Sequence, residues 1–276
     1  MCLSLVGSEM CIRDRVVESA VEAPTEKSEW SAKNPYFTNI IENYVLNGEG
    51  SRKETRHIVF ELGDSGLDYK VGDALGVVPE NPPHIVEELI QIQGWDREQL
   101  VTTHNGERNL YDALKLVQSL ADKVVSSGLK ITVKFVSRTR GEKQWSANDQ
   151  QLLPPELVAN APSDAPADKV EHLISDAKAM EDYLWTRDYV DIMREFDVKY
   201  TPEEFLGLAG RLKPRLYSIA SSHDAHPGLV ELTVGIVRFS YHGRDRGGLC
   251  TQFMADEIGT TTKRVGVFMS PTKSFV

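Results

Sequence analysis

The stretch "KPRLYSIASS", residues 213 to 222, threads charged, aromatic and hydroxyl side chains through a short apolar run. Successive side chains of a strand point to opposite faces, so Arg215 and Tyr217 share one side and Ser218 lies on the other. An Arg can hold a phosphate through paired charge-assisted hydrogen bonds, and a phenol ring can lie on a flat heterocycle. An ordinary edge strand can also carry these residues, so the interpretation depends on the residues that come after them in the chain.

The next apolar stretch is "GLVELTVGIVRFSYHG", residues 228 to 243, in which apolar residues nearly alternate with polar or small ones. Such alternation predicts a strand. The turn-forming sequence "SHDAHPG", residues 222 to 228, separates it from the strand before. We therefore expect the two strands to form a hairpin.

A glycine pair comes after this strand, in "RDRGGLCTQFMADEIG", residues 244 to 259. Gly247 and Gly248 allow the backbone to pass close to a bulky group, and Thr251 can cap the amphipathic helix that comes next. Free N–H groups and the positive end of the helix dipole form an anion site suited to a diphosphate. Glycines before a helix are often only a turn, but the order Arg, Tyr, strand, glycine pair, helix favours a single large ligand.

The rest of the chain is β-rich at both ends and helical in between. Alternating or β-branched stretches predict strands over residues 35 to 48, 54 to 66, 67 to 83 and 263 to 270. Apolar spacing predicts helices over residues 83 to 95, with Gly94 as the C-cap, 109 to 126 and 168 to 196, and a polar loop over 138 to 168. The pattern predicts a β-rich α+β fold in which helices interrupt a compact antiparallel β structure.

The composition is that of an ordinary globular chain: 276 residues, 41% hydrophobic and 26% charged. A net charge of −10 argues against binding to nucleic acid or to an anionic membrane, which need clustered Lys and Arg. There is no apolar run long enough to span a bilayer. Three cysteines favour a reducing, cytoplasmic setting, and no metal-binding motif occurs, since His223 and His226 fit a solvated turn.

The N-terminal segment needs separate treatment. Residues 1 to 15, "MCLSLVGSEMCIRDR", are a poor signal peptide because Glu9 interrupts the apolar part and the basic residues follow it. The string resembles a translated sequencing adapter, and we expect it to be non-native. Residues 16 to 32 are rich in Ala, Glu and Ser, which predicts a disordered linker or arm.

Three short motifs carry a family resemblance. They resemble the FAD-contacting motifs of the ferredoxin-NADP reductase-like flavoproteins, in the branch that includes cytochrome P450 reductase. Within that branch the chain most resembles the flavoprotein (alpha) subunits of NADPH-dependent sulfite reductase. The motifs are "RLYS" at 215 to 218, "TVG" at 233 to 235 and "GLCT" at 248 to 251, and the stretches "KETRHIVFELGDSGLDYKVGDALGVVPENP" and "YLWTRDYVDIMREF" are also similar.

The resemblance implies an FAD-binding domain over residues 33 to 276, an antiparallel β-barrel with a helical connecting insertion at about 83 to 205. Arg215 would hold the diphosphate, Tyr217 would stack on the isoalloxazine, and Ser218 would lie near flavin N5 in a catalytic position. Phe239 stands where relatives often have Tyr, so the ring is kept and a hydroxyl is lost. The other implied cofactor-binding residues are Leu216, Thr233, Val234, Gly235, Gly248, Leu249, Cys250 and Thr251.

The resemblance also implies an oxidoreductase that takes a hydride from NADPH onto FAD. Electrons would pass to a sulfite reductase hemoprotein subunit or another acceptor. The NADPH-binding domain is expected after Val276, and the chain gives no support for an FMN domain before residue 33. Two alternatives stay open: a reductase of the P450-reductase type, and a non-enzymatic interaction module made of a β-barrel and helices.

Overall fold

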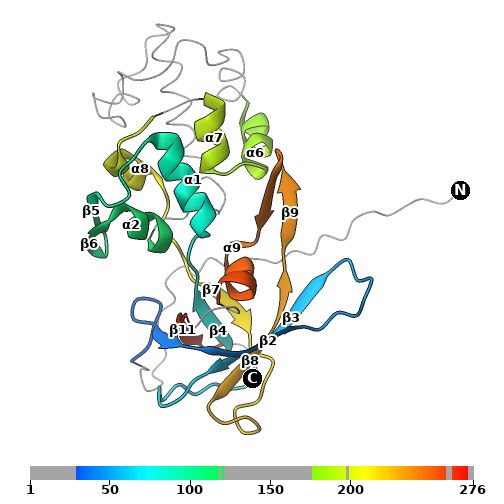
Figure 1. The fold of residues 1–276 in the computed structure, drawn as a ribbon. Helices are drawn as coiled ribbons and strands as arrows, with labels where there is room; N and C mark the ends of the chain where they lie inside the picture. The colour runs from blue at the N-terminus through cyan, green and yellow to red at the C-terminus, as the bar shows by residue number, and fades with distance from the viewer. Residues whose placement is uncertain (1–28, 118–119, 121–175, 197–198, 259–262, 273–276) are drawn as a thin grey trace, which may run out of the picture.

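The computed structural model describes residues 29–117, 120, 176–196, 199–258 and 263–272 (Figure 1). Its larger strands gather at one end of the molecule and the helices α1, α2, α6, α7 and α8 at the other, and a narrow two-stranded ribbon runs between them (Figure 1). Three predicted segments lie outside the described residues. They are the expected non-native residues 1 to 15, most of the expected linker over 16 to 32, and the expected loop over 138 to 168.

Two antiparallel sheets form the strand-rich end, with the orders β1-β11-β4-β7 and β2-β3-β8. The β-rich, antiparallel character predicted from the sequence is confirmed. The strands are β1 (Tyr36–Thr38), β2 (Ile40–Val45), β3 (Glu54–Glu61), β4 (Ala74–Val78), β7 (Arg215–Ser218), β8 (Leu229–Ile236) and β11 (Val265–Ser270).

The two sheets share one apolar core. Val230, Leu232 and Val234 on β8 are buried, as their alternation predicted, and they belong to the same cluster as Leu75 and Val77 on β4. Because cross-strand neighbours on one face bury their side chains together, this alternation holds the register of β8.

The hairpin predicted between the strands at 215 and 228 forms only next to the turn, where the Ala220 N–H donates to the Glu231 carbonyl at 2.8 Å. β7 pairs with β4, where Leu216 lies opposite Gly76, whereas all eight residues of β8 pair with β3. A single bridge between Ile219 and Leu232 joins the two sheets at this point. The segment between the two strands is too long for a tight turn, so each strand is free to pair elsewhere in the chain.

The helical end has its own core, built from α1, α2, α6, α7 and α8. Gly94 caps α1 with a φ of 73°, and its N–H donates to the carbonyls of Ile90 and Gln91, as predicted. A short pair of strands lies beside these helices. The bounds are α1 (Pro83–Gln93), β5 (Leu100–Thr103), β6 (Gly106–Asn109), α2 (Leu110–Leu116), α6 (Ala177–Trp185), α7 (Tyr189–Phe196) and α8 (Pro202–Leu208).

Two of the predicted helices differ from expectation where the structure describes them, and their residues 118–119, 121–126 and 168–175 lie outside the described residues. α2 ends at Leu116 because Asn81, which is buried, occupies the carbonyl of Leu114 with its side chain and that of Lys115 with its backbone N–H. The helix predicted over 168 to 196 is broken between α6 and α7. There the side chain of Asp188 accepts a hydrogen bond from the Asp191 N–H at 3.1 Å and starts a new helix.

The ribbon consists of β9 (Arg238–Tyr241) and β10 (Arg244–Gly247). Its tip is a two-residue turn in which His242 and Gly243 have φ values of 53° and 71°. Positive φ at both positions matches the turn type that joins two twisted strands directly. The sequence pattern predicted no strand over the residues of β10, so the ribbon is a finding of the structure.

After the ribbon, α9 (Leu249–Gln252) continues into the π-helical turn η2 (Phe253–Ile258). The N-cap is Gly248, and the prediction that Thr251 caps this helix is wrong. Thr251 lies inside the helix, and its hydroxyl donates to the carbonyl of Gly248 at 3.0 Å.

The described N-terminal residues already contact the sheets. The Trp30 ring lies against Tyr36, with 5.3 Å between ring centroids, and its indole N–H donates to the carbonyl of Ser65 at 2.8 Å. Ordered contacts therefore begin at least as early as Trp30, slightly before the boundary expected at residue 33.

Gly76 gives a first testable prediction. A Cβ at this position would lie 2.3 Å from the ring of Phe268 on the neighbouring strand, so Gly76→Ala forces the ring or the strand to move. We expect a loss of about 1–3 kcal/mol in the free energy of unfolding, measured by urea denaturation. The control is Gly235→Ala on β8, where a Cβ would meet no heavy atom within 4 Å. Equal stability of the two variants would contradict this packing.

Candidate functional site

The three motifs singled out in the sequence lie next to one another in space. Ile219, directly after β7, forms its bridge with Leu232, directly before Thr233 on β8. At the far end of β8, the N–H of Gly248 donates to the carbonyl of Val237 at 3.0 Å. The strand β8 therefore connects "RLYS" at one end with "GLCT" at the other.

Arg215 and Tyr217 share one face of β7. Their partners across the strand pair are Val77 and Leu75, both fully buried, and directly opposed residues share a face. Arg215 and Tyr217 are themselves half-buried, while Ser218 is exposed and lies on the other face. This agrees with the strand geometry expected from the sequence.

The candidate residues on β8 and α9 divide into exposed and buried groups. Thr233 and Gly235 are exposed, and there is open space where a Gly235 side chain would be. Val234, Leu249 and Cys250 are buried in the core. Val234 and Cys250 can reach a ligand only through their backbone, whereas Leu249 also lines the cavity described below.

The start of α9 is tightly packed around the glycine pair. A Cβ on Gly247 would lie 2.5 Å from the Gln252 side chain, and one on Gly248 would lie 2.7 Å from the Thr251 hydroxyl. Larger residues therefore do not fit this turn. Within α9, the N–H groups of the first helical turn have no i−4 carbonyl to pair with.

A cavity of about 380 Å³ lies beside this turn, where the ribbon meets α1 and the α6–α7 junction. Phe239 and Tyr241 extend from β9 into its lining, with their rings edge to face at a centroid distance of 5.6 Å. The lining residues are Pro82, His84, Ile85, Leu184, Trp185, Thr186, Arg187, Asp188, Phe239, Tyr241, Asp245, Arg246, Gly247, Leu249 and Gln252.

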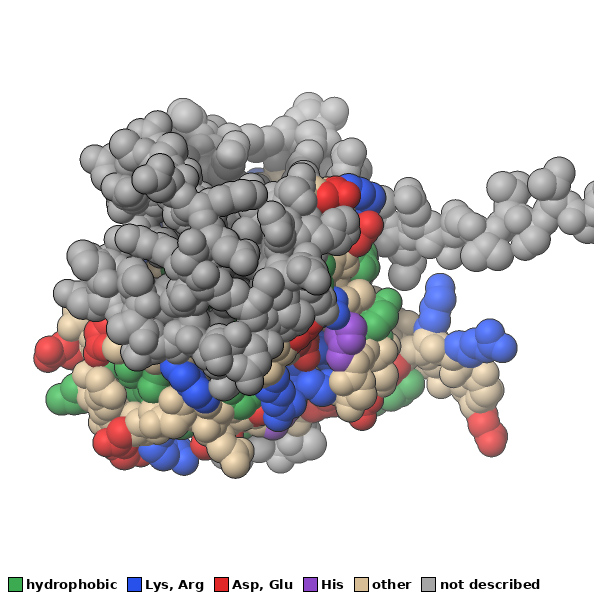
Figure 2. All heavy atoms as spheres, turned by 90° about the horizontal axis from the view of Figure 1, so that it is seen from above, with side chains coloured by type: hydrophobic (Ala, Val, Ile, Leu, Met, Phe, Trp, Pro, Cys, Tyr) green, Lys and Arg blue, Asp and Glu red, His purple; other side chains and the backbone are tan. Residues whose placement is uncertain are grey.

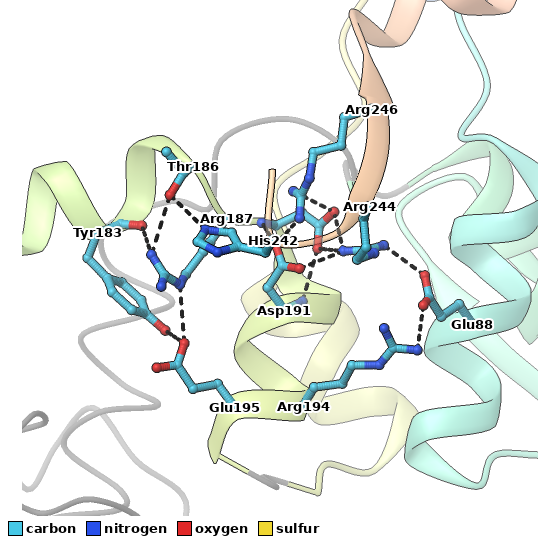
Figure 3. A network of polar contacts seen from close by, with 11 residues as sticks. Glu88, Tyr183, Thr186, Arg187, Asp191, Arg194, Glu195, His242, Arg244 and Arg246 are labelled. Atoms are coloured by element: carbon cyan, nitrogen blue, oxygen red, sulfur yellow. Dashed lines mark hydrogen bonds and ion pairs between the residues drawn. The ribbon is translucent and has the colours of Figure 1, made fainter. Parts of the chain in front are cut away.

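The helical end contributes a cation to this cavity that the sequence analysis did not find. The Arg187 Nε donates to Glu195 at 3.2 Å and its Nη1 donates to the Tyr183 carbonyl, while the guanidinium lies 3.9 Å from the Tyr183 ring centroid (Figure 3). Burial, together with Glu195, raises the pKa of Tyr183, so its hydroxyl remains a donor to that carboxylate. Arg187 is thus held rigidly at the cavity wall.

A cluster of ion pairs joins the ribbon to the helices (Figure 3). On β10, Arg244 contacts both carboxylate oxygens of Asp188 at 2.9 and 3.0 Å, and Asp191 at 2.8 Å. Arg246 contacts Asp188 at 3.0 Å and also pairs with Asp191. Arg244 reaches Glu88 on α1 at 2.7 Å. We call these five residues the hairpin cluster.

The two aspartates of the hairpin cluster are buried together. Burial, followed by repulsion from Asp191, raises the pKa of Asp188. Burial opposes ionisation of Asp191 too, but hydrogen bonds from Arg246 and from the Asp188 backbone hold its pKa below the usual range. The pair therefore depends on the two arginines for its charge balance.

The base of the ribbon has its own anchor. Arg238, the first residue of β9, donates to Asp256 in η2 at 2.7 Å and to Glu54 on β3 at 2.8 Å. These hydrogen bonds lower the pKa of both Glu54 and Asp256. The ribbon is thus attached to the sheets at its base and to the helices further along.

The described surface seen in Figure 2 mixes Lys and Arg with Asp and Glu side chains. Among the described residues there is no helix long and apolar enough to cross a membrane. Within the same part of the chain, His, Cys, Asp and Glu side chains form no group of three or more that could hold a metal ion.

Residues 28–253 match the family model described as FAD binding domain. This match covers most of the chain and includes all three motifs and the helices α1, α2, α6, α7 and α8 that precede them. The chain belongs to the FAD binding domain family. Within this FAD-binding domain, Gly247 of the glycine turn lines the cavity, and the Gly248 N–H donates to Val237, directly after β8.

Curated relatives of this FAD-binding domain are named sulfite reductase (NADPH) flavoprotein alpha-component. The protein of that name from Bacillus subtilis is 35% identical over 243 residues, which is 87% of this chain and 35% of the relative. Those from Vibrio cholerae and Escherichia coli O157:H7 are 32% and 31% identical, covering 93% and 88% of this chain. The chain spans about a third of the length of these relatives.

Proposed function

We propose that this chain binds FAD along β7, β8 and the start of α9. Arg215 holds the diphosphate from the β7 side, and the N–H groups of residues 249 to 251 hold it from the helix. Tyr217 lies against the isoalloxazine ring, with Leu216 beside it on the strand, and Ser218 is near the reactive edge of the flavin. The observation that carries this proposal is the closeness of the three motifs. Ile219, directly after "RLYS", bridges Leu232, directly before "TVG", and the Gly248 N–H donates to Val237, two residues after "TVG".

The residues present fit such a ligand. FAD is long, with an anionic centre and a flat ring at each end, so its site needs cations or N–H groups between two apolar surfaces. Open space beside Gly235 and Thr233 adjoins β8, and the aromatic cavity at Phe239 offers the second surface, for the adenosine end. Arg187 adds a positive charge at the wall of that cavity.

We also propose that the two sheets of the strand-rich end close into a β-barrel. A barrel completed by β7 and β8, with the helices over about 83 to 205 as a connecting subdomain, would hold the flavin on its rim. The sheet orders and the bridge between Ile219 and Leu232 support it.

We further propose that the intact protein is an NADPH-dependent oxidoreductase that serves sulfite reduction. Bound FAD supplies the chemistry, since it accepts a hydride and can release electrons singly. The names of the relatives include NADPH and sulfite reductase, which supports NADPH as the donor. The acceptor that we propose is a hemoprotein subunit or another electron carrier. Because the chain spans about a third of the length of those relatives, this activity is proposed for the whole protein, and we assign the NADPH site to no residue of this chain. A cytoplasmic setting is consistent with this chemistry.

The direct test is flavin uptake by the purified chain. We expect saturable FAD binding in equimolar amount, a yellow protein and quenched flavin fluorescence, because Tyr217 and the diphosphate site contact both parts of the ligand. The measurement is a fluorescence titration with FAD, followed by absorbance of the desalted complex.

The same titration separates the alternatives. A folded chain that takes up no FAD would contradict the proposal and favour a non-enzymatic interaction module. A bound flavin that NADPH does not reduce, but dithionite does, would agree with a donor site outside this chain.

A further inference from the structure

The ribbon of β9 and β10 cannot hold its own position. An isolated two-stranded ribbon is marginally stable in water, and all four residues of β9 are exposed. Its orientation must therefore come from side chains that reach the two ends of the molecule. Arg238 fixes the orientation of the ribbon at its base, and the hairpin cluster fixes it on the side that faces the helices.

The hairpin cluster lies next to the diphosphate turn in the chain. Arg246 immediately precedes Gly247, and its side chain is only 11% exposed. The side chains of its partners Asp188 and Asp191 are 7% and 9% exposed. It lines the same cavity as Phe239. A change in the direction of β10 would move the glycine turn and the cavity wall together.

The geometry requires arginine at these positions. Arg246 reaches Asp188 with Nη1 and Asp191 with Nη2. Arg244 reaches both aspartates with Nη1 and Glu88 with Nη2. A lysine ammonium cannot make such a two-armed contact. The apolar cores of the helical end and of the strand-rich end share no residue. Packing between these cores therefore does not replace the ion pairs of the hairpin cluster.

We propose that Arg246 and Asp188 are positioning residues: through the hairpin cluster, the helices hold the ribbon and its glycine turn in the orientation that binds the diphosphate and adenosine half of FAD. This inference rests on the proposed FAD site. It predicts that the cluster controls the preference for FAD over FMN, because FMN lacks the half of the ligand that the ribbon contacts.

The test compares FAD and FMN dissociation constants for the wild-type chain and for Arg246→Lys. We expect the FAD constant to rise by about tenfold in the variant, with the FMN constant nearly unchanged. Asp188→Asn should shift the same ratio in the same direction. Arg194→Lys is the control, because Arg194 is 51% exposed and contacts only the rim of the cluster, at Glu88.

Thermal unfolding checks that each variant is folded at the binding temperature. If Arg246→Lys does not fold, the double variant Asp188→Asn, Arg246→Gln removes one charge of each sign and leaves Arg244 paired with Asp191. A double variant that also fails to fold would overturn the inference, because the cluster would then be required for folding and not for positioning.

The remaining outcomes are also decisive. Equal weakening of FAD and FMN, or an unchanged ratio in a folded variant, would overturn the positioning role while leaving the FAD site intact. Failure of the wild-type chain to bind FAD would instead remove the proposed function and this inference with it.

Discussion

Replacing Arg215 with alanine is expected to raise the dissociation constant for FAD by about 10- to 100-fold. The diphosphate would lose a charge-assisted contact from a side chain that is already half-buried and oriented. The Arg215 Nη1 donates to the carbonyl of Lys213 at 3.0 Å, which holds the guanidinium before the ligand arrives. Fluorescence titration with FAD measures the effect.

Lys213→Ala provides the matched control, since it removes the same charge from an exposed side chain and keeps the carbonyl that holds Arg215. Its FAD affinity should change by less than about threefold. Equal losses in the two variants would mean that overall charge, and not a specific contact, determines binding.

The largest effect on stability is expected at Phe60. Its side chain is fully buried on β3, the central strand between β2 and β8, where Val230 lies directly opposite. Phe60→Ala should lower the free energy of unfolding by about 3–5 kcal/mol, because it removes apolar contacts and leaves a cavity in the core shared by both sheets. Urea denaturation followed by circular dichroism gives this value.

Phe37→Ala is the corresponding control. Phe37 is 52% exposed on the edge strand β1, so the same substitution should change stability by no more than about 0.5 kcal/mol. A similar loss at both positions would contradict the described core.

The local features of the fold were predictable from the sequence. Alternation at Val230, Leu232 and Val234 determined the inner face of β8, and apolar spacing with Gly94 determined α1 and its end. Side-chain direction repeats every two residues in a strand and about every 3.6 in a helix, so neighbouring residues carry that information. The shared face of Arg215 and Tyr217 follows from the same rule.

Strand partners and helix ends were less predictable because they depend on distant residues. β7 pairs with β4 across more than a hundred residues, and α2 ends where Asn81 occupies its last carbonyls. No local pattern near 215 or 116 encodes either contact.

The candidate site also combines features that the sequence predicts with features that depend on distant residues. The sequence by itself determined the three motifs and the glycine turn, since each depends on residues within a few positions of one another. Only the tertiary structure decided that Arg187 lines the cavity and that Asp188 and Asp191 hold the ribbon. These aspartates are more than fifty residues from Arg246, and their pairing depends on folding that buries opposite charges together.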